Sequence, residues 1–213
     1  MNALRPVALI ILDGWGYAEP GPGNAASLAR TPTIDGLLER YPWVLLEASG
    51  NAVGLPDGVM GNSEVGHMAL GSGRVVCQDL SRINGAIEDG SFYENPVLAP
   101  AMADAAERGV PIHLMGLLSD GGVHSAIAHI HALVEMARRA GAAKVFIHTF
   151  VDGRDTAPHA GDGLLVDLEG FLHTVGLGAT ATIVGRYYAM NRDNRWDRIK
   201  IAYDALVLSL IHI

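Results

Sequence analysis

The chain alternates short apolar runs with stretches in which apolar residues recur at helical spacing. The apolar runs predict buried strands at residues 7–12, 43–48, 111–118, 144–151 and 179–184. Helices are predicted at residues 33–40, 83–87, 99–108, 124–140, 164–174 and 195–206, and another is expected to start near Ser63. Residues 49–62 are rich in glycine and predict a loop. Strands that alternate with helices in this way predict an α/β fold with a largely parallel sheet.

The length, charge and cysteine content narrow the class of protein. The 213 residues suffice for one large domain or two small ones, and the pattern resets at residues 75–80, where we expect a domain boundary. A formal net charge of −8 argues against nucleic-acid binding, which needs clustered positive charge. Cys77 is the only cysteine, which excludes an intrachain disulfide and fits a reducing compartment. No apolar run could span a bilayer or act as a signal peptide, so we expect a cytoplasmic protein without a membrane partner.

Polar residues follow the predicted strands at the edge where open parallel sheets gather their ligands. Asp13 ends the first apolar run, where a turn role and a divalent-metal role fit equally well. Glycine-bearing polar loops follow three later strands and contain Ser119 to His124, Asp152 to Asp155, and Gly185-Arg186 with Arg192 beyond. Arginine makes bidentate contacts to phosphate, and the recurrence of these loops favours an anion site over ordinary loop composition. Arg195 and Arg198 on the last helix are expected to form surface ion pairs instead.

Ser63 is a candidate nucleophile at the start of a predicted helix. Small neighbours, Gly61 and Gly66, let a substrate approach, and the free N–H groups of a helix start attract an anion. The alternative is that Ser63 is only an N-cap, with Glu64 in the first turn. His67 lies four residues further on the same helical face, where we expect it to support the structure more than to act as a base.

Two other motifs fit the sequence poorly. A nucleophile elbow requires Gly-x-Ser-x-Gly, but Gly66 follows Ser63 by three residues, which counts against an esterase. The glycines at positions 21 and 23 match a loose dinucleotide fingerprint, yet residues 13–20 separate them from the strand and Pro22 removes a backbone donor. Phosphoryl chemistry therefore remains the favoured hypothesis.

Five motifs together resemble one known family. They are LIILDGWG at residues 9–16, MGNSEVGH at 60–67, SDGGVHS at 119–125, DGRDT at 152–156 and GRYYAM at 185–190. The sequence over residues 7–207 resembles 2,3-bisphosphoglycerate-independent phosphoglycerate mutase. This resemblance implies a glycolytic monomer that interconverts 3-phosphoglycerate and 2-phosphoglycerate through a phosphoserine, with two manganese ions. It further implies that residues 1–77 begin an alkaline-phosphatase-like metal-binding domain and that residues 78–207 form most of an inserted α/β transferase domain.

The resemblance also implies a role for each site residue. Ser63 is the nucleophile, Asp13 and Ser63 bind one metal ion, and the glycerate phosphate and carboxylate are held by His124, Arg154, Asp155, Arg186 and Arg192. Asn191 stands where the family usually has aspartate.

The chain is shorter than the family and lacks the remaining site arginines, the site lysine and the other metal ligands, while residues 208–213 no longer follow the family. We therefore expect an amino-terminal fragment with a non-native tail, inactive alone and with exposed apolar surface within residues 1–77. Two alternatives remain open: another alkaline-phosphatase-like phosphoryl-transfer enzyme, and a phosphometabolite-binding domain.

Overall fold

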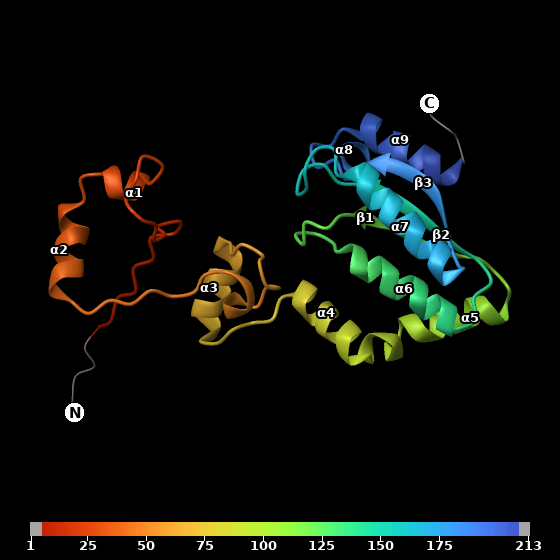
Figure 1. The fold of residues 1–213 in the computed structure, drawn as a ribbon, viewed down its shortest axis with the longest axis horizontal. Coiled ribbons are helices and arrows are strands. Elements are labelled where there is room, and N and C mark those ends of the chain that lie inside the picture. The colour runs from red at the N-terminus through yellow and green to blue at the C-terminus, as the bar shows by residue number, and fades with distance from the viewer. Residues whose placement is uncertain (1–5, 209–213) are drawn as a thin grey trace. The chain divides into compact units, whose positions relative to one another are not determined.

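The computed structural model describes residues 6–208 of the chain. The chain divides into two compact units, Met1–Cys77 and Gln78–Ile213 (Figure 1), and each is described by itself. Within residues 6–208 no helix is both long enough and apolar enough to cross a membrane. Apart from Leu208, the tail predicted at residues 208–213 lies outside the described residues.

The first unit consists of short helices joined by irregular segments. The helices are α1 (Ala25–Leu28), α2 (Pro32–Arg40), the 3-10 helix η1 (Gly50–Val53) and α3 (Ser63–Ser72). Pro32 is the first residue of α2. Proline has no backbone N–H, and at this position no helical hydrogen bond is lost, because the N–H groups of the first turn have no partner within the helix. The predicted helices at residues 33–40 and near Ser63 are therefore confirmed.

The strands predicted at residues 7–12 and 43–48 are not formed. Both segments are irregular, and their apolar side chains face solvent, with Ile10 81% exposed and Leu46 78% exposed. A strand needs a neighbouring strand for its backbone hydrogen bonds, and the described part of this unit pairs no segment with either run. The expected exposed apolar surface is thus present within residues 7–77.

The predicted loop at residues 49–62 folds back against α3. Val53 and Leu55 from the loop pack with Val65 of α3 in a small core. The backbone at Gly61 passes so close to Ala48 that a Cβ at residue 61 would lie 1.7 Å from the Ala48 carbonyl oxygen. Only glycine permits this approach, so Gly61 determines how the chain enters α3.

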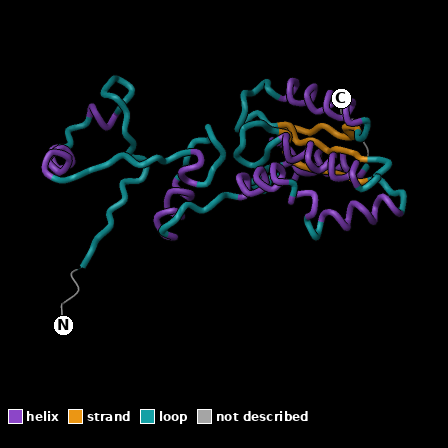
Figure 2. Tube along the Cα trace, turned by 60° about the horizontal axis from the view of Figure 1, so that its bottom comes forward, coloured by secondary structure: helices purple, strands orange, loops and turns teal. Residues whose placement is uncertain are grey.

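The second unit is a parallel sheet with helices on both sides of the strands (Figure 2). Its elements are α4 (Asp79–Asp89), the 3-10 helix η2 (Ser91–Glu94), α5 (Leu98–Glu107), β1 (Ile112–Leu118), α6 (Ile127–Arg139), β2 (Val145–Val151), α7 (Gly161–Val175), β3 (Ala179–Gly185), α8 (Arg186–Ala189) and α9 (Trp196–Val207). The strands are ordered β1-β2-β3, and both pairings are parallel, with Ile112 opposite Val145 and Phe146 opposite Ala179. The predicted α/β fold with a parallel sheet is confirmed for this unit.

Helices α6 and α7 cover one face of the sheet and build the main core (Figure 1). Val145 and Ile147 of β2 pack there with Val134 of α6 and Leu168 of α7, and none of the four is more than 2% exposed. Burial of these side chains stabilises the fold by about 25 cal/mol for each Å² of apolar surface removed from water. This packing holds the carboxyl ends of the three strands at one edge.

A row of polar side chains crosses the opposite face of the sheet. Successive side chains of a strand point to opposite faces, so His148 lies on the face opposite to its neighbour Ile147, which is in the core. His113 Nδ1 lies 2.9 Å from His148 Nε2, and His148 Nδ1 lies 3.0 Å from Thr182 Oγ1. His148 is only 8% exposed. Burial, and to a smaller extent His113, lowers the pKa of His148 below its ordinary value.

Helix α6 begins at Ile127, later than the predicted start at residue 124. In the preceding loop, the Ser125 hydroxyl donates to the Leu117 carbonyl oxygen at 2.7 Å, and the Ile127 N–H donates to the Ser119 carbonyl oxygen at 3.0 Å. These bonds satisfy backbone groups without a helical turn. His124 therefore lies in the loop after β1, not in the helix.

Candidate active site

Ser63 is the first residue of α3, and a residue far away in the sequence holds its hydroxyl. Ser63 Oγ donates to Asp13 Oδ2 across 2.7 Å, and both side chains are exposed. The start of a helix presents free N–H groups and a dipole field equivalent to about half a positive charge. An anionic group placed beside this hydroxyl is therefore stabilised.

Asn62, not Ser63, caps α3. Asn62 Oδ1 accepts from the Val65 N–H at 3.1 Å, whereas Ser63 already belongs to the helix. This role of Asn62 was not predicted, although an asparagine immediately before a helix is a known capping signal. Because Asn62 serves as the cap, the Ser63 hydroxyl is available for chemistry.

His67 lies close to Ser63 but serves the backbone. Its Nδ1 is 2.8 Å from the Ser63 carbonyl oxygen and 3.2 Å from Ser63 Oγ. A carbonyl oxygen can only accept, so the shorter contact requires a proton on Nδ1. In that state His67 cannot take the Ser63 proton through Nδ1, which fits the expected structural role.

Asp13 and Ser63 offer two hard oxygen donors of the kind that Mg²⁺ or Mn²⁺ prefers. Among the residues that the structure describes, no group of three or more His, Cys, Asp or Glu side chains could hold a metal ion. The pair fits one side of a divalent-metal site and does not complete it.

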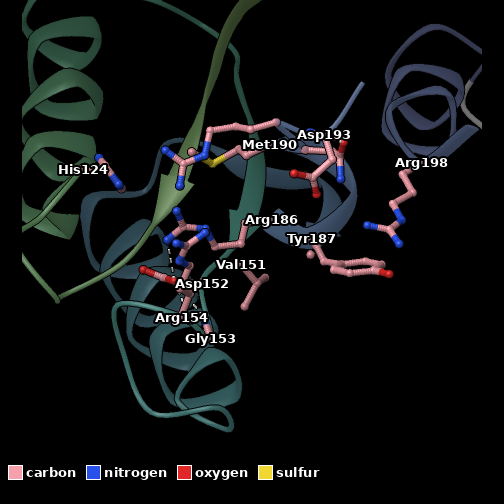
Figure 3. Close-up of a pocket in the computed structure, with 13 residues that line it drawn as sticks. His124, Val151, Asp152, Gly153, Arg154, Arg186, Tyr187, Met190, Asp193 and Arg198 are labelled. Carbon is pink, nitrogen blue, oxygen red and sulfur yellow. Dashed lines mark hydrogen bonds and ion pairs between the residues drawn. The ribbon is translucent and has the colours of Figure 1, made fainter. Parts of the chain in front are cut away.

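The loops after the strands of the second unit surround a cavity of about 800 Å³ (Figure 3). The predicted site residues His124, Arg154, Arg186 and Arg192 all line it. Asp155 is not among the lining residues, but its carboxylate accepts a hydrogen bond from Arg186, which lines the cavity. Five side chains that the sequence assigns to three different loops are therefore brought together, whereas Asp13 and Ser63 belong to the first unit.

Asp152 lies at the base of this cavity and was not a predicted site residue. Its Oδ2 accepts from the Ser119 hydroxyl at 2.7 Å, and its Oδ1 accepts from Arg186 at 2.9 Å and from the backbone N–H groups of residues 153, 154 and 155 at 2.8, 2.9 and 3.1 Å. Burial alone would raise the pKa of Asp152, but these hydrogen bonds outweigh burial and hold it well below its ordinary value. Asp152 is thus a buried carboxylate that stays ionised.

Arg186 donates hydrogen bonds to two carboxylates from a single guanidinium nitrogen. Its Nη1 donates to Asp152 Oδ1 at 2.9 Å and to Asp155 Oδ2 at 2.6 Å, and the side chain is 11% exposed. The bond to Asp155 raises the pKa of Arg186 against the opposing effect of burial, and the bond to Asp152 adds to the rise. Within residues 6–208 the other guanidinium nitrogens have no bonded partner, so they can still donate to a ligand.

Arg154 and Arg192 bring to the cavity positive charge that no described carboxylate offsets in an ion pair. Neither side chain forms an ion pair with another described residue. His124 adds a weaker contact, because its Nε2 lies 3.8 Å from Asp155 Oδ2, beyond hydrogen-bonding distance. The cavity is therefore suited to an anion.

The segment that carries Arg192 is shaped by Asn191. Asn191 Oδ1 accepts from the N–H groups of Asp193 and Arg195 at 2.9 and 3.1 Å. An aspartate could accept the same bonds, so the asparagine costs no hydrogen bond here and lacks only the negative charge that an aspartate would place beside Arg192.

The surface ion pair predicted for Arg195 is present, with Asp197 at 2.7 Å, whereas Arg198 forms no ion pair with another residue that the structure describes. Arg198 instead lines the cavity, with its guanidinium 4.1 Å from the centre of the Tyr187 ring (Figure 3). An aromatic face can hold a cation in place of a carboxylate.

The fold and the cavity define an α/β protein with an arginine-lined cavity at the carboxyl ends of its strands. Comparison with known proteins identifies its family: the model of the family described as BPG-independent PGAM N-terminus matches residues 83–212. The chain belongs to the 2,3-bisphosphoglycerate-independent phosphoglycerate mutase family.

Relatives support the same assignment over nearly the whole chain. The chain is 55% identical to 2,3-bisphosphoglycerate-independent phosphoglycerate mutase 1 of Methanosarcina barkeri, over 98% of this chain and 40% of that protein. It is 54% identical to the mutase of Vibrio cholerae, over 98% of this chain and 41% of that protein. A crystal structure of Leishmania mexicana phosphoglycerate mutase at low cobalt concentration matches with a TM-score of 0.74 and 36% identity, over 94% of this chain and 38% of that one. The chain thus spans about two fifths of the length of these relatives.

Proposed function

We propose that the chain supplies the phosphoryl-carrying serine and part of the substrate site of a phosphoglycerate mutase. The reaction is the interconversion of 3-phosphoglycerate and 2-phosphoglycerate through a phosphoserine at Ser63. The observation that carries the proposal is the 2.7 Å bond between Ser63 Oγ and Asp13, made by a serine that a neighbouring asparagine releases from capping. Membership of the family supports the same function.

The cavity of the second unit is proposed to hold the glycerate. A phosphoglycerate carries a phosphate and a carboxylate, and Arg154 and Arg192 offer two uncompensated cations within one cavity. His124, Asp155 and the unbonded nitrogens of Arg186 complete the proposed contacts. These contacts would hold the phosphate and the carboxylate when the ligand binds, and after the phosphoryl group has passed to Ser63 the carboxylate contact would keep the glycerate in the cavity.

Asp13 and Ser63 are proposed to hold one of two manganese ions. When bound, the ion would lower the pKa of the Ser63 hydroxyl and so favour the nucleophilic alkoxide. Residues 1–77 then form part of an alkaline-phosphatase-like domain, and residues 78–207 form most of a transferase domain inserted into it. The described residues contribute two oxygen donors to this ion, so the other ligands must come from elsewhere in the mutase.

A phosphometabolite-binding domain is the second candidate, and one observation favours it: the cavity is built entirely within residues 124–198, without any residue of the first unit. Such a protein would bind 3-phosphoglycerate but would not need Ser63. Another alkaline-phosphatase-like enzyme that transfers phosphoryl groups would need Ser63 but not the glycerate contacts.

A hybrid enzyme tests the proposal. Residues 1–208 of this chain replace the aligned segment of the Methanosarcina barkeri mutase, and formation of 2-phosphoglycerate from 3-phosphoglycerate is measured with Mn²⁺ present. We expect activity, a phosphorylated Ser63 peptide by mass spectrometry, and a loss of about 1,000-fold or more in kcat for Ser63→Ala. Ser72→Ala, a serine at the other end of α3, is the matched control and should leave kcat unchanged. A folded hybrid whose activity survives Ser63→Ala would refute the proposal.

A further inference from the structure

Asp152 joins the loops that follow all three strands of the second unit. Ser119 follows β1, residues 153–155 follow β2, and Arg186 follows β3, and each donates to the same carboxylate. Strand ends in a parallel sheet lie side by side, so one side chain can reach three loops that are distant in the sequence. One side chain therefore connects the three loops.

The Asp152 carboxylate cannot contact a ligand in the cavity. Its side chain is 0% exposed, and its two oxygens receive five hydrogen bonds from the protein. Four of these bonds end on Oδ1 and one on Oδ2, and the absence of exposed side-chain surface keeps a ligand away from both oxygens. Any effect of Asp152 on binding must act through the residues that it holds.

Two of those residues are proposed ligand contacts. The bond from the Arg154 N–H fixes the backbone from which the Arg154 side chain projects, and the bond from Arg186 fixes one guanidinium nitrogen. Ser119 extends the arrangement, because its hydroxyl also accepts from the Gly121 N–H at 3.1 Å. A Cβ at Gly121 would lie 2.6 Å from the Asp155 carbonyl oxygen, so the first two loops are also in close contact.

We propose that Asp152 is the positioning residue that sets the spacing of Arg154 and Arg186, so that the cavity selects a ligand with two anionic groups over a single anion. This inference rests on the proposed function, since the doubly anionic ligand is a phosphoglycerate. Arginines held at a fixed spacing match two anions at once, whereas a single phosphate needs no such spacing. Selectivity between the two ligands is therefore the property that Asp152 controls.

The test uses the full chain and two probes, 3-phosphoglycerate and inorganic phosphate, with affinities measured by calorimetry. Asp152→Asn keeps the shape of the side chain but loses the charge that binds Arg186. We expect it to weaken 3-phosphoglycerate binding about 10-fold or more and phosphate binding less than about 3-fold. Asp104→Asn is the control and should change neither affinity, because within residues 6–208 Asp104 forms an ion pair only with the exposed Arg108, at 3.0 Å.

A measurement without ligand separates this inference from the proposed function. Exchange of the Arg186 guanidinium protons, followed by NMR, should accelerate about 10-fold in Asp152→Asn, while the core amide of Leu168 remains protected. If Asp152→Asn does not fold, Ser119→Ala removes one of the five bonds and should change both readouts in the same direction. A parallel loss of both affinities, or unchanged guanidinium exchange, would show that Asp152 serves only the fold. If the unaltered chain binds neither probe, the proposed substrate site fails, and guanidinium exchange alone decides whether Asp152 orders the arginines.

Discussion

Asp13 and Ser63 are 50 residues apart in the chain, yet Asp13 Oδ2 accepts the Ser63 hydroxyl across 2.7 Å. The contact joins an irregular segment to the start of α3, and neither residue is buried. A hydrogen bond between exposed groups contributes about 1 kcal/mol or less, so the contact does little for stability. Its value lies in placing two oxygens where a cation could bridge them.

The chain by itself is expected to be inactive as a mutase. Two oxygen donors are too few for a divalent ion that prefers about six ligands. With Mn²⁺ and 3-phosphoglycerate supplied, a coupled assay should detect no 2-phosphoglycerate, and calorimetry should show only weak Mn²⁺ binding that Asp13→Ala removes. Appreciable turnover by the purified chain would contradict this prediction.

Arginines inside and outside the cavity should differ in their effect on ligand affinity. Arg154→Ala and Arg192→Ala are each expected to weaken 3-phosphoglycerate binding about 10- to 100-fold, or about 1.4 to 2.7 kcal/mol, because each removes a charge-assisted contact. Arg195→Ala is the matched control, since Arg195 pairs with the exposed Asp197 and should change affinity less than about 2-fold. Equal effects of all three variants would mean that the cavity attracts the ligand by overall charge alone.

The close contact between two loops predicts a cost for Gly121→Ala. The added Cβ would meet the Asp155 backbone at 2.6 Å, which cannot move as a side chain would, so we expect a destabilisation of about 1–3 kcal/mol. Gly170→Ala in the middle of α7 meets no atom within 4 Å and should stabilise the chain by about 0.5–1 kcal/mol. Urea unfolding followed by circular dichroism measures both changes, and similar effects of the two variants would refute the argument.

The buried His148 predicts a loss of stability in mild acid. Burial, and then His113, lowers its pKa, so the unfolded chain binds a proton more readily than the folded one. The free energy of unfolding should therefore decrease as the pH falls below about 6.5, by up to about 1.4 kcal/mol per pH unit for this histidine. Burial also lowers the pKa of His129 and His131, which adds to the same slope.

Two variants isolate the contribution of His148. His148→Gln should flatten the decline between about pH 6.5 and 5, whereas His173→Gln, at an exposed position on α7, should leave it unchanged. Unfolding curves at several pH values provide the comparison. An identical slope in both variants would exclude His148 as a source of the pH dependence.

Most of the second unit could be predicted from the sequence because its signals are local. The strands at 111–118, 144–151 and 179–184 are apolar runs, and each finds a neighbour and a covering helix within the same unit. The runs at 7–12 and 43–48 carry an equally strong pattern but do not form strands, since the described part of their unit offers no strand to pair with. Apolar patterning indicates what a segment can become, and pairing decides whether it does.

Part of the candidate site could likewise be predicted from the sequence, and part could not. Positions after strands were enough to single out His124, Arg154, Asp155, Arg186 and Arg192, because ligands gather at the carboxyl ends of parallel strands. Ser63 was singled out at a predicted helix start, and Asp13 at the end of an apolar run that forms no strand. The sequence could not show that Asp152 would accept five hydrogen bonds, that Asn62 would cap α3, or that Arg198 would lie over Tyr187. These roles depend on distances between loops, which only the packed sheet sets. The sequence by itself thus determined the chemical groups available to this protein, and the tertiary structure decided which of them are held, neutralised or left to meet a ligand.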